Sequence, residues 1–81
     1  MRLFVLMKIR RNDILAKRVA DRLKTLRHER NLTQENVRFD LEINIGRIEA
    51  CQHIVSLPTL AYLCDYYKIS LKDFFDGIET K

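Results

Sequence analysis

At 81 residues, with 47% hydrophobic and 32% charged side chains, the chain is long enough for one domain with a modest core and has no composition typical of disorder. Its two cysteines are too few for the disulfide framework of a small secreted protein, and the N-terminal apolar run Leu3–Met7 is too short for a signal peptide or a transmembrane helix. We therefore expect a cytoplasmic protein that does not enter a membrane.

The net charge of +4 is unevenly distributed along the chain. Residues 1–30 contain ten Lys and Arg against three Asp and Glu, whereas residues 31–81 contain five against eight. A basic first third attracts polyanions, nucleic acid first and acidic membrane surfaces second. The alternative is that these basic side chains are only the solvated face of a helix.

The first twelve residues are expected to form an N-terminal arm or a short strand, because Phe4 and Val5 favour extended backbone. Asn12 or Asp13 can cap the first helix, which we expect to end near Arg30. Apolar residues recur along it at helical spacing, with basic residues on the other face. They are Ile14, Leu15, Val19, Leu23 and Leu26.

Two short helices are predicted next. Thr33 is a typical N-cap for a second helix that ends at about residues 40–42, and Asn44 is a typical N-cap for a third that reaches Ala50. Their spacing indicates which residues face the core: Val37, Leu41, Ile45 and Ile48.

The last third of the sequence predicts two more helices. Ser56 or Leu57 caps the fourth, with Pro58 in its first turn, while Ser70 caps the fifth and Gly77 ends it. The apolar stripe here comprises Leu60, Leu63, Cys64, Tyr67, Leu71, Phe74 and Phe75. The predicted fold is all-α and compact, with five helices over residues 13–78 after an arm at 1–12 and before a tail at 79–81.

Neither metal nor catalytic chemistry is expected. Cys51 and Cys64 both lie in apolar stretches and are predicted to be small buried hydrophobes. Cys51 and His53 lie two residues apart, and Cys64 and His28 could complete a metal-binding set with them, but no Cys-x-x-Cys or His-x-x-x-His pair supports such a site. No serine–histidine–acid set, phosphate-binding glycine loop or paired-carboxylate cleft is visible. We expect neither an enzyme nor a cofactor or small-molecule substrate.

Five segments, in order, resemble a known family. They are Leu23-Lys24-x-Leu26-Arg27, Leu32-Thr33-Gln34-Glu35, Arg47-Ile48-Glu49, Ser56-Leu57-Pro58-Thr59-Leu60 and Ile69-Ser70-Leu71-x-x-Phe74-Phe75. Over residues 14–76 this pattern is similar to the Cro and phage-repressor (lambda-repressor-like) helix-turn-helix family. The resemblance implies a transcriptional regulator that binds double-stranded DNA, and we expect it to be a homodimer on paired half-sites.

The resemblance also implies roles for individual residues. Gln34 matches a glutamine that contacts a DNA phosphate at the start of the second helix, where backbone N–H groups favour an anion. The third helix matches the recognition helix, and Asn44, Gly46 and Arg47 are its candidates for reading base edges, with Arg38 nearby.

Arg27 and Glu49 match an ion pair that ties the first helix to the end of the third, a structural role rather than a binding one. The interval from Gln34 to Glu49 is shorter than in typical members by about three residues, close to one helical turn, so the recognition helix is shortened. Glu42 occupies the position of the family's turn glycine and would have to adopt a left-handed conformation.

Charge on the motif itself is unfavourable for DNA. Between Thr33 and Glu49 there are two arginines against four carboxylates. Because DNA affinity depends on neutralising phosphates, we expect Arg10 and Arg11 of the arm to supply much of the attraction, along the backbone or in a minor groove. The alternative is a protein-interaction module that keeps the fold, in which the apolar arm and the acidic later helices meet a partner or a second copy.

Overall fold

The computed structural model describes the backbone of residues 2–78 and the side chains of residues 14–78. It contains five helices: α1 (Arg2–Glu29), α2 (Gln34–Leu41), α3 (Ile45–Glu49), α4 (Leu57–Tyr66) and α5 (Leu71–Asp76). No strand occurs within residues 2–78, and the predicted all-α, five-helix fold is confirmed. No helix in this part of the chain is both long and apolar enough to cross a membrane.

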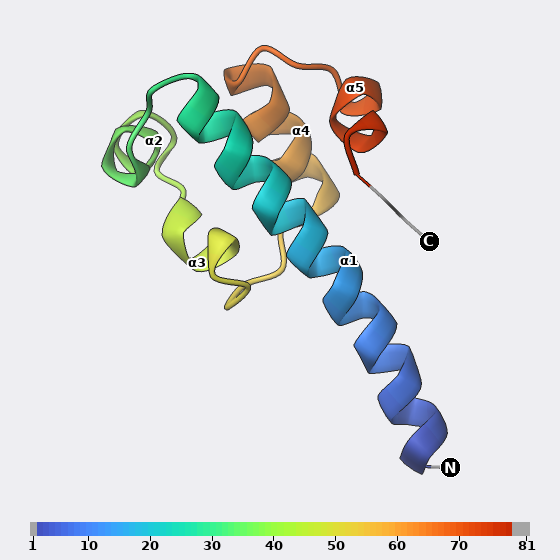
Figure 1. Ribbon diagram of the computed structural model, residues 1–81. Helices are drawn as coiled ribbons and strands as arrows, with labels where there is room; N and C mark the ends of the chain where they lie inside the picture. Colours follow the sequence, from blue (N-terminus) through green and yellow to red (C-terminus); the bar gives the residue numbers. More distant parts are fainter. Residues whose placement is uncertain (1, 79–81) are drawn as a thin grey trace.

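The long helix α1 corrects the prediction for the N-terminus. It begins at Arg2 and runs through Asn12 and Asp13, so these residues do not cap it and the expected short strand is wrong. The reason is that residues 2–29 contain neither glycine nor proline and are rich in Leu, Arg and Lys, which favour helix. Figure 1 shows the N-terminal half of α1 projecting beyond the other helices. The expected tail at 79–81 lies outside the described residues.

The core lies against the C-terminal half of α1, with α2 and α3 on one side of it and α4 and α5 on the other (Figure 1). Its buried members come from all five helices and from the residue that directly follows α4. They are Val19, Leu23, Leu26, Val37, Ile45, Ile48, Leu60, Leu63, Cys64, Tyr67 and Phe74. These are the residues that helical spacing predicted. Ile14, Leu15 and Phe75, which were also predicted to be buried, are exposed.

Each of the four later helices begins at a side-chain cap. Thr33 and Asn36 form a reciprocal capping box, in which the Asn36 N–H donates to Thr33 Oγ1 at 3.0 Å and the Thr33 N–H donates to Asn36 Oδ1 at 2.9 Å. Asn44, Ser56 and Ser70 cap α3, α4 and α5, and the side chain of each accepts from the backbone N–H three residues later. Each cap stabilises its helix by about 1 kcal/mol, which helps such short helices to form.

Left-handed residues terminate four of the helices without the use of glycine. Asn31, Glu42, Cys51 and Lys68 have φ values of 56°, 58°, 61° and 63°. Glu42 therefore does adopt the conformation expected of the turn position. Cys51, predicted to be buried, is exposed. It stands just past the end of α3, where the chain turns away from the core.

Gly77 leaves room for an arginine that binds the end of α5. Arg22 donates from Nε to the Phe74 carbonyl at 3.2 Å and from Nη2 to the Asp73 carbonyl at 3.3 Å. A Cβ on residue 77 would lie 2.5 Å from Arg22 Cζ, so an alanine there must displace the guanidinium.

We expect Gly77→Ala to lower the free energy of unfolding in urea by about 1 kcal/mol, because it breaks the Arg22 hydrogen bonds. The φ of residue 77 is −86°, which alanine adopts freely, so backbone strain adds nothing. In an Arg22→Ala background the same substitution should cost nothing. An equal cost in both backgrounds would contradict this account.

Candidate nucleic-acid interface

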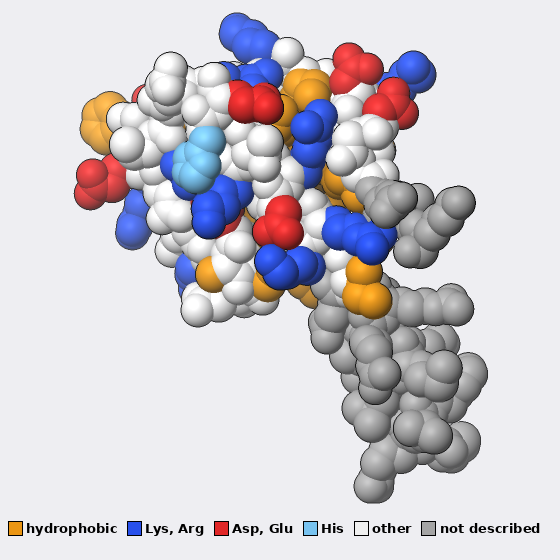
Figure 2. All heavy atoms as spheres, in the orientation of Figure 1, with side chains coloured by type: hydrophobic (Ala, Val, Ile, Leu, Met, Phe, Trp, Pro, Cys, Tyr) orange, Lys and Arg blue, Asp and Glu red, His pale blue; other side chains and the backbone are white. Residues whose placement is uncertain are grey.

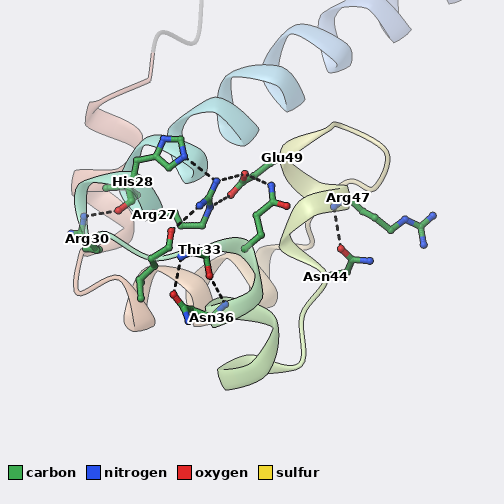
Figure 3. Close-up of polar contacts among 11 residues, drawn as sticks. Arg27, His28, Arg30, Thr33, Asn36, Asn44, Arg47 and Glu49 are labelled. Atoms are coloured by element: carbon green, nitrogen blue, oxygen red, sulfur yellow. Dashed lines mark hydrogen bonds and ion pairs between the residues drawn. The ribbon is translucent and has the colours of Figure 1, made fainter.

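A buried ion pair holds α3 against the end of α1. Arg27 Nε donates to Glu49 Oε2 at 2.8 Å and Arg27 Nη2 donates to Glu49 Oε1 at 3.0 Å, a bidentate arrangement (Figure 3). The two side chains are only 7% and 3% exposed. The hydrogen bond to Glu49 raises the pKa of Arg27. The pair implied by the resemblance is thus present, and it neutralises one carboxylate of the motif.

The same guanidinium also fixes the turn before α2. Arg27 Nη1 donates to the Leu32 carbonyl at 2.7 Å, just ahead of the Thr33 cap. Arg27 Nη2 also lies 3.1 Å from His28 Nε2, and because a guanidinium only donates, this histidine nitrogen accepts. One side chain therefore sets the positions of both α2 and α3 relative to α1.

Gln34 is connected to this ion pair. Its Nε2 donates to Glu49 Oε1 at 3.0 Å, although the side chain as a whole is exposed. An amide nitrogen carries two hydrogens, so one N–H is left for another acceptor. Gly46 allows this approach, because a Cβ there would lie 3.0 Å from Gln34 Oε1. Gln34 and Gly46 thus lie side by side, at the point where the start of α2 contacts α3.

Helix α3 and its N-cap turn two polar residues outward. Ile45 and Ile48 are buried in the core and Glu49 faces Arg27, so Asn44 and Arg47 are left on the outer side (Figure 3). Asn44 Oδ1 accepts from the Arg47 N–H at 3.3 Å as the cap, which leaves the Asn44 amide N–H groups for other partners. The Arg47 guanidinium forms no hydrogen bond or ion pair with any side chain that the structure describes.

A shallow hollow of about 280 Å³ lies next to these two residues. Besides Asn44 and Arg47 it is lined by His53 from the α3–α4 connector and Thr59 from the first turn of α4. Neither His53 nor Thr59 was among the residues predicted to contact DNA. No sequence pattern indicates that the connector returns to α3, so these neighbours follow only from the tertiary structure.

Two of the four carboxylates between Thr33 and Glu49 have partners within the fold. Glu49 pairs with Arg27, and Asp40 accepts a short hydrogen bond from the Tyr66 hydroxyl of α4. That hydrogen bond raises the pKa of Tyr66 to about 12. Glu35 and Glu42 are exposed, as is Arg38, which lies one turn after Gln34 on α2.

Several cations of the basic first third also have structural partners. Arg22 binds α5, as described above, and Arg30 donates to the backbone carbonyls of Tyr67 and Leu26. Lys17 pairs with Asp21 at 3.2 Å on the surface of α1. Figure 2 shows blue cationic and red acidic side chains interspersed on the face in view rather than one continuous basic patch. Arg10 and Arg11 lie outside the residues whose side chains are described.

The described side chains contain no group of three or more His, Cys, Asp or Glu that could hold a metal ion. Cys64 is buried, and burial raises the pKa of its thiol, whereas Cys51 is on the surface. The two cysteines considered as ligands thus belong to different environments.

Comparison with known proteins identifies no relative. No family model, no curated protein and no solved structure matches this chain. The fold and the site define a five-helix bundle whose short third helix presents an asparagine and an arginine to solvent beside a glutamine. Its function has to be argued from these groups.

Proposed function

We propose that this protein is a DNA-binding transcriptional regulator of the Cro and phage-repressor helix-turn-helix type, with a shortened recognition helix. The observation that carries the proposal is the placement of α3. Its apolar residues and Glu49 are buried, and its outer side offers Asn44 and Arg47 next to Gln34. A helix anchored in this way can approach a major groove without rearrangement.

The exposed groups suit the two kinds of contact that DNA offers. Arg47 can donate two hydrogen bonds to guanine or bind a phosphate, and the Asn44 amide can pair with adenine. The free N–H of Gln34, with the backbone N–H groups at the start of α2, suits a phosphate. Gly46, which has no side chain, lets the α3 backbone come close to the duplex.

Electrostatic attraction is assigned to cations around this surface. Arg38 lies one helical turn after Gln34 on the exposed side of α2. Arg10 and Arg11 are proposed to contact the DNA backbone or a minor groove from α1. We propose a cytoplasmic homodimer that binds paired half-sites, with double-stranded DNA as its ligand and no cofactor.

The proposal is tested by selecting DNA from a random duplex library and measuring affinity by fluorescence anisotropy over a series of salt concentrations. Binding should be saturable and should weaken as salt increases. Arg47→Ala should raise the dissociation constant by about tenfold or more, the effect of 1–3 kcal/mol for an arginine on a base or phosphate.

Lys72→Ala is the matched control, because it also removes one positive charge but from the exposed surface of α5. It should change the affinity little. The proposal fails if no saturable binding occurs at low salt, or if Lys72→Ala weakens binding as much as Arg47→Ala does. A protein-interaction module is the second candidate, and the exposed apolar surface discussed next favours it.

A further inference from the structure

An apolar groove lies on the molecule along the middle of α1. The structure describes seven exposed large hydrophobic side chains, and four of them line this groove: Leu15, Ile54, Leu57 and Phe75. The groove encloses about 450 Å³, and none of the described Lys, Arg, Asp or Glu side chains lines it. Such a concentration of exposed apolar surface in a small protein indicates an interaction site.

The two walls of the groove differ. Ile54 in the α3–α4 connector and Leu57 at the start of α4 are 71% and 64% exposed, so this wall forms an apolar ridge. The opposite wall comes from α1, where Ala16 and Ala20 lie one helical turn apart and leave room beside Leu15 because their side chains are small. An apolar ridge therefore stands next to an apolar hollow on the same face of the molecule.

We propose that this face is where two copies of the chain form a dimer, with the ridge of each copy in the hollow of the other. Ile54 and Leu57 of one copy then pack against Leu15 and Ala16 of the second. Because ridge and hollow lie side by side on one surface, a single two-fold rotation about an axis beside the two connectors makes both contacts at once. Both grooves are filled and the dimer is closed.

The area of this face fits a reversible dimer. A fully exposed large apolar residue presents on the order of 200 Å², so the four exposed hydrophobic residues present about 400 Å² on each copy at their observed exposure. Cys51 and His53 are exposed and also line the groove, which raises the area to about 600 Å². The total of about 1,200 Å² lies at the lower end for specific interfaces, and we expect a dissociation constant in the micromolar range.

The position of the groove also suits a dimer on paired half-sites, and this part of the argument rests on the proposed function. Half-sites one helical turn apart place the two recognition helices about 34 Å from each other, so each lies about 17 Å from the two-fold axis. Ile48 and His53 line the groove and also the hollow beside Asn44 and Arg47. The proposed interface is therefore next to α3, as such a short distance requires.

Sedimentation velocity of the full chain without DNA, from micromolar to millimolar concentration, tests the interface. Ile54→Asp should raise the dimer dissociation constant by about 100-fold, since two equivalent apolar contacts are lost. Ile54 lies in an exposed connector, so the variant should fold, which circular dichroism checks. Phe39→Asp is the control, because Phe39 is 87% exposed on α2 and outside the groove. It should leave the dimer intact.

A mixing experiment tests whether the ridge enters the hollow of the second copy. Ile54→Asp alters the ridge and Leu15→Lys alters the α1 wall, so each variant alone should be monomeric at concentrations where the parent chain is dimeric. Mixed together they should form a heterodimer, which keeps one intact apolar contact and places Asp against Lys in the other. Failure to form this heterodimer overturns the proposed arrangement.

DNA binding separates this inference from the proposed function. Ile54→Asp should bind a single half-site as the parent does, but should lose tenfold or more of the affinity that the parent gains from a second half-site, on the order expected when two linked sites bind together. A dimer that binds no DNA supports the interface and refutes the proposed function. A parent chain that binds DNA but stays monomeric at every concentration overturns the interface alone, as does a dimer that Ile54→Asp leaves unchanged.

Discussion

Replacing Arg27 by methionine is expected to lower the free energy of unfolding by about 3–5 kcal/mol, the typical cost of removing one partner of a buried ion pair. Glu49, 3% exposed, would keep only the Gln34 amide as a partner for its charge. The Leu32 carbonyl would also lose its donor. Urea denaturation followed by circular dichroism measures the loss.

Two further variants test the cause. Replacing both partners, Arg27→Met with Glu49→Leu, should recover most of the stability, because no unpaired charge is left in the core. Lys17→Met removes the exposed pair with Asp21 and should change stability by no more than about 0.5 kcal/mol. A cost for Arg27→Met close to that of Lys17→Met would show that the ion pair does not hold α3 in place.

Stability should also decrease in alkali because of Tyr67. Burial raises the pKa of this phenol to about 12 from its ordinary value of 10.0. As the pH rises above 10 the unfolded chain loses the phenol proton, whereas the folded protein keeps it until about pH 12. The unfolded state is therefore favoured progressively over this range, by up to about 2–3 kcal/mol. Urea denaturation at a series of pH values measures the loss.

Tyr67→Phe should remove most of this alkaline loss. At neutral pH it should leave stability unchanged or raise it slightly, since the Tyr67 hydroxyl is buried without a hydrogen-bond partner among the described residues. Tyr66→Phe is the comparison and should change the alkaline loss less than Tyr67→Phe does. The pKa of Tyr66 is also raised to about 12, but by its hydrogen bond to Asp40 at the surface, where solvent weakens the effect. A Tyr67→Phe variant with the parent's pH profile would contradict this assignment.

Local patterns in the sequence predicted most of the helical framework. Thr33, Asn44, Ser56 and Ser70 were recognised as caps because a capping hydrogen bond spans only three residues and needs no distant partner. Helical spacing identified the buried stripes for a similar reason. The N-terminus was mispredicted, since Asn12 is a good cap but the residues before it are good helix formers, and the helix simply continues.

The candidate site was predicted less completely. Asn44 and Arg47 were correctly placed on a short third helix, and Arg27 with Glu49 was suggested by the family resemblance rather than by any local pattern. That Gln34 joins this ion pair, and that His53 and Thr59 lie beside α3, did not follow from the sequence. These contacts connect residues on different helices and loops.

The sequence by itself determined where the four later helices begin, which of their faces are apolar and how many charges each segment carries. Only the tertiary structure decided which other polar groups meet: Gln34 and Glu49 are 15 residues apart, and Tyr66 and Asp40 are 26 apart. It likewise decided that four of the seven exposed large hydrophobic side chains in the described part of the chain line one groove along α1. The physical reason is that hydrophobic spacing and caps act within a few residues, whereas pairing of charges and exposure of apolar surface depend on how whole helices pack.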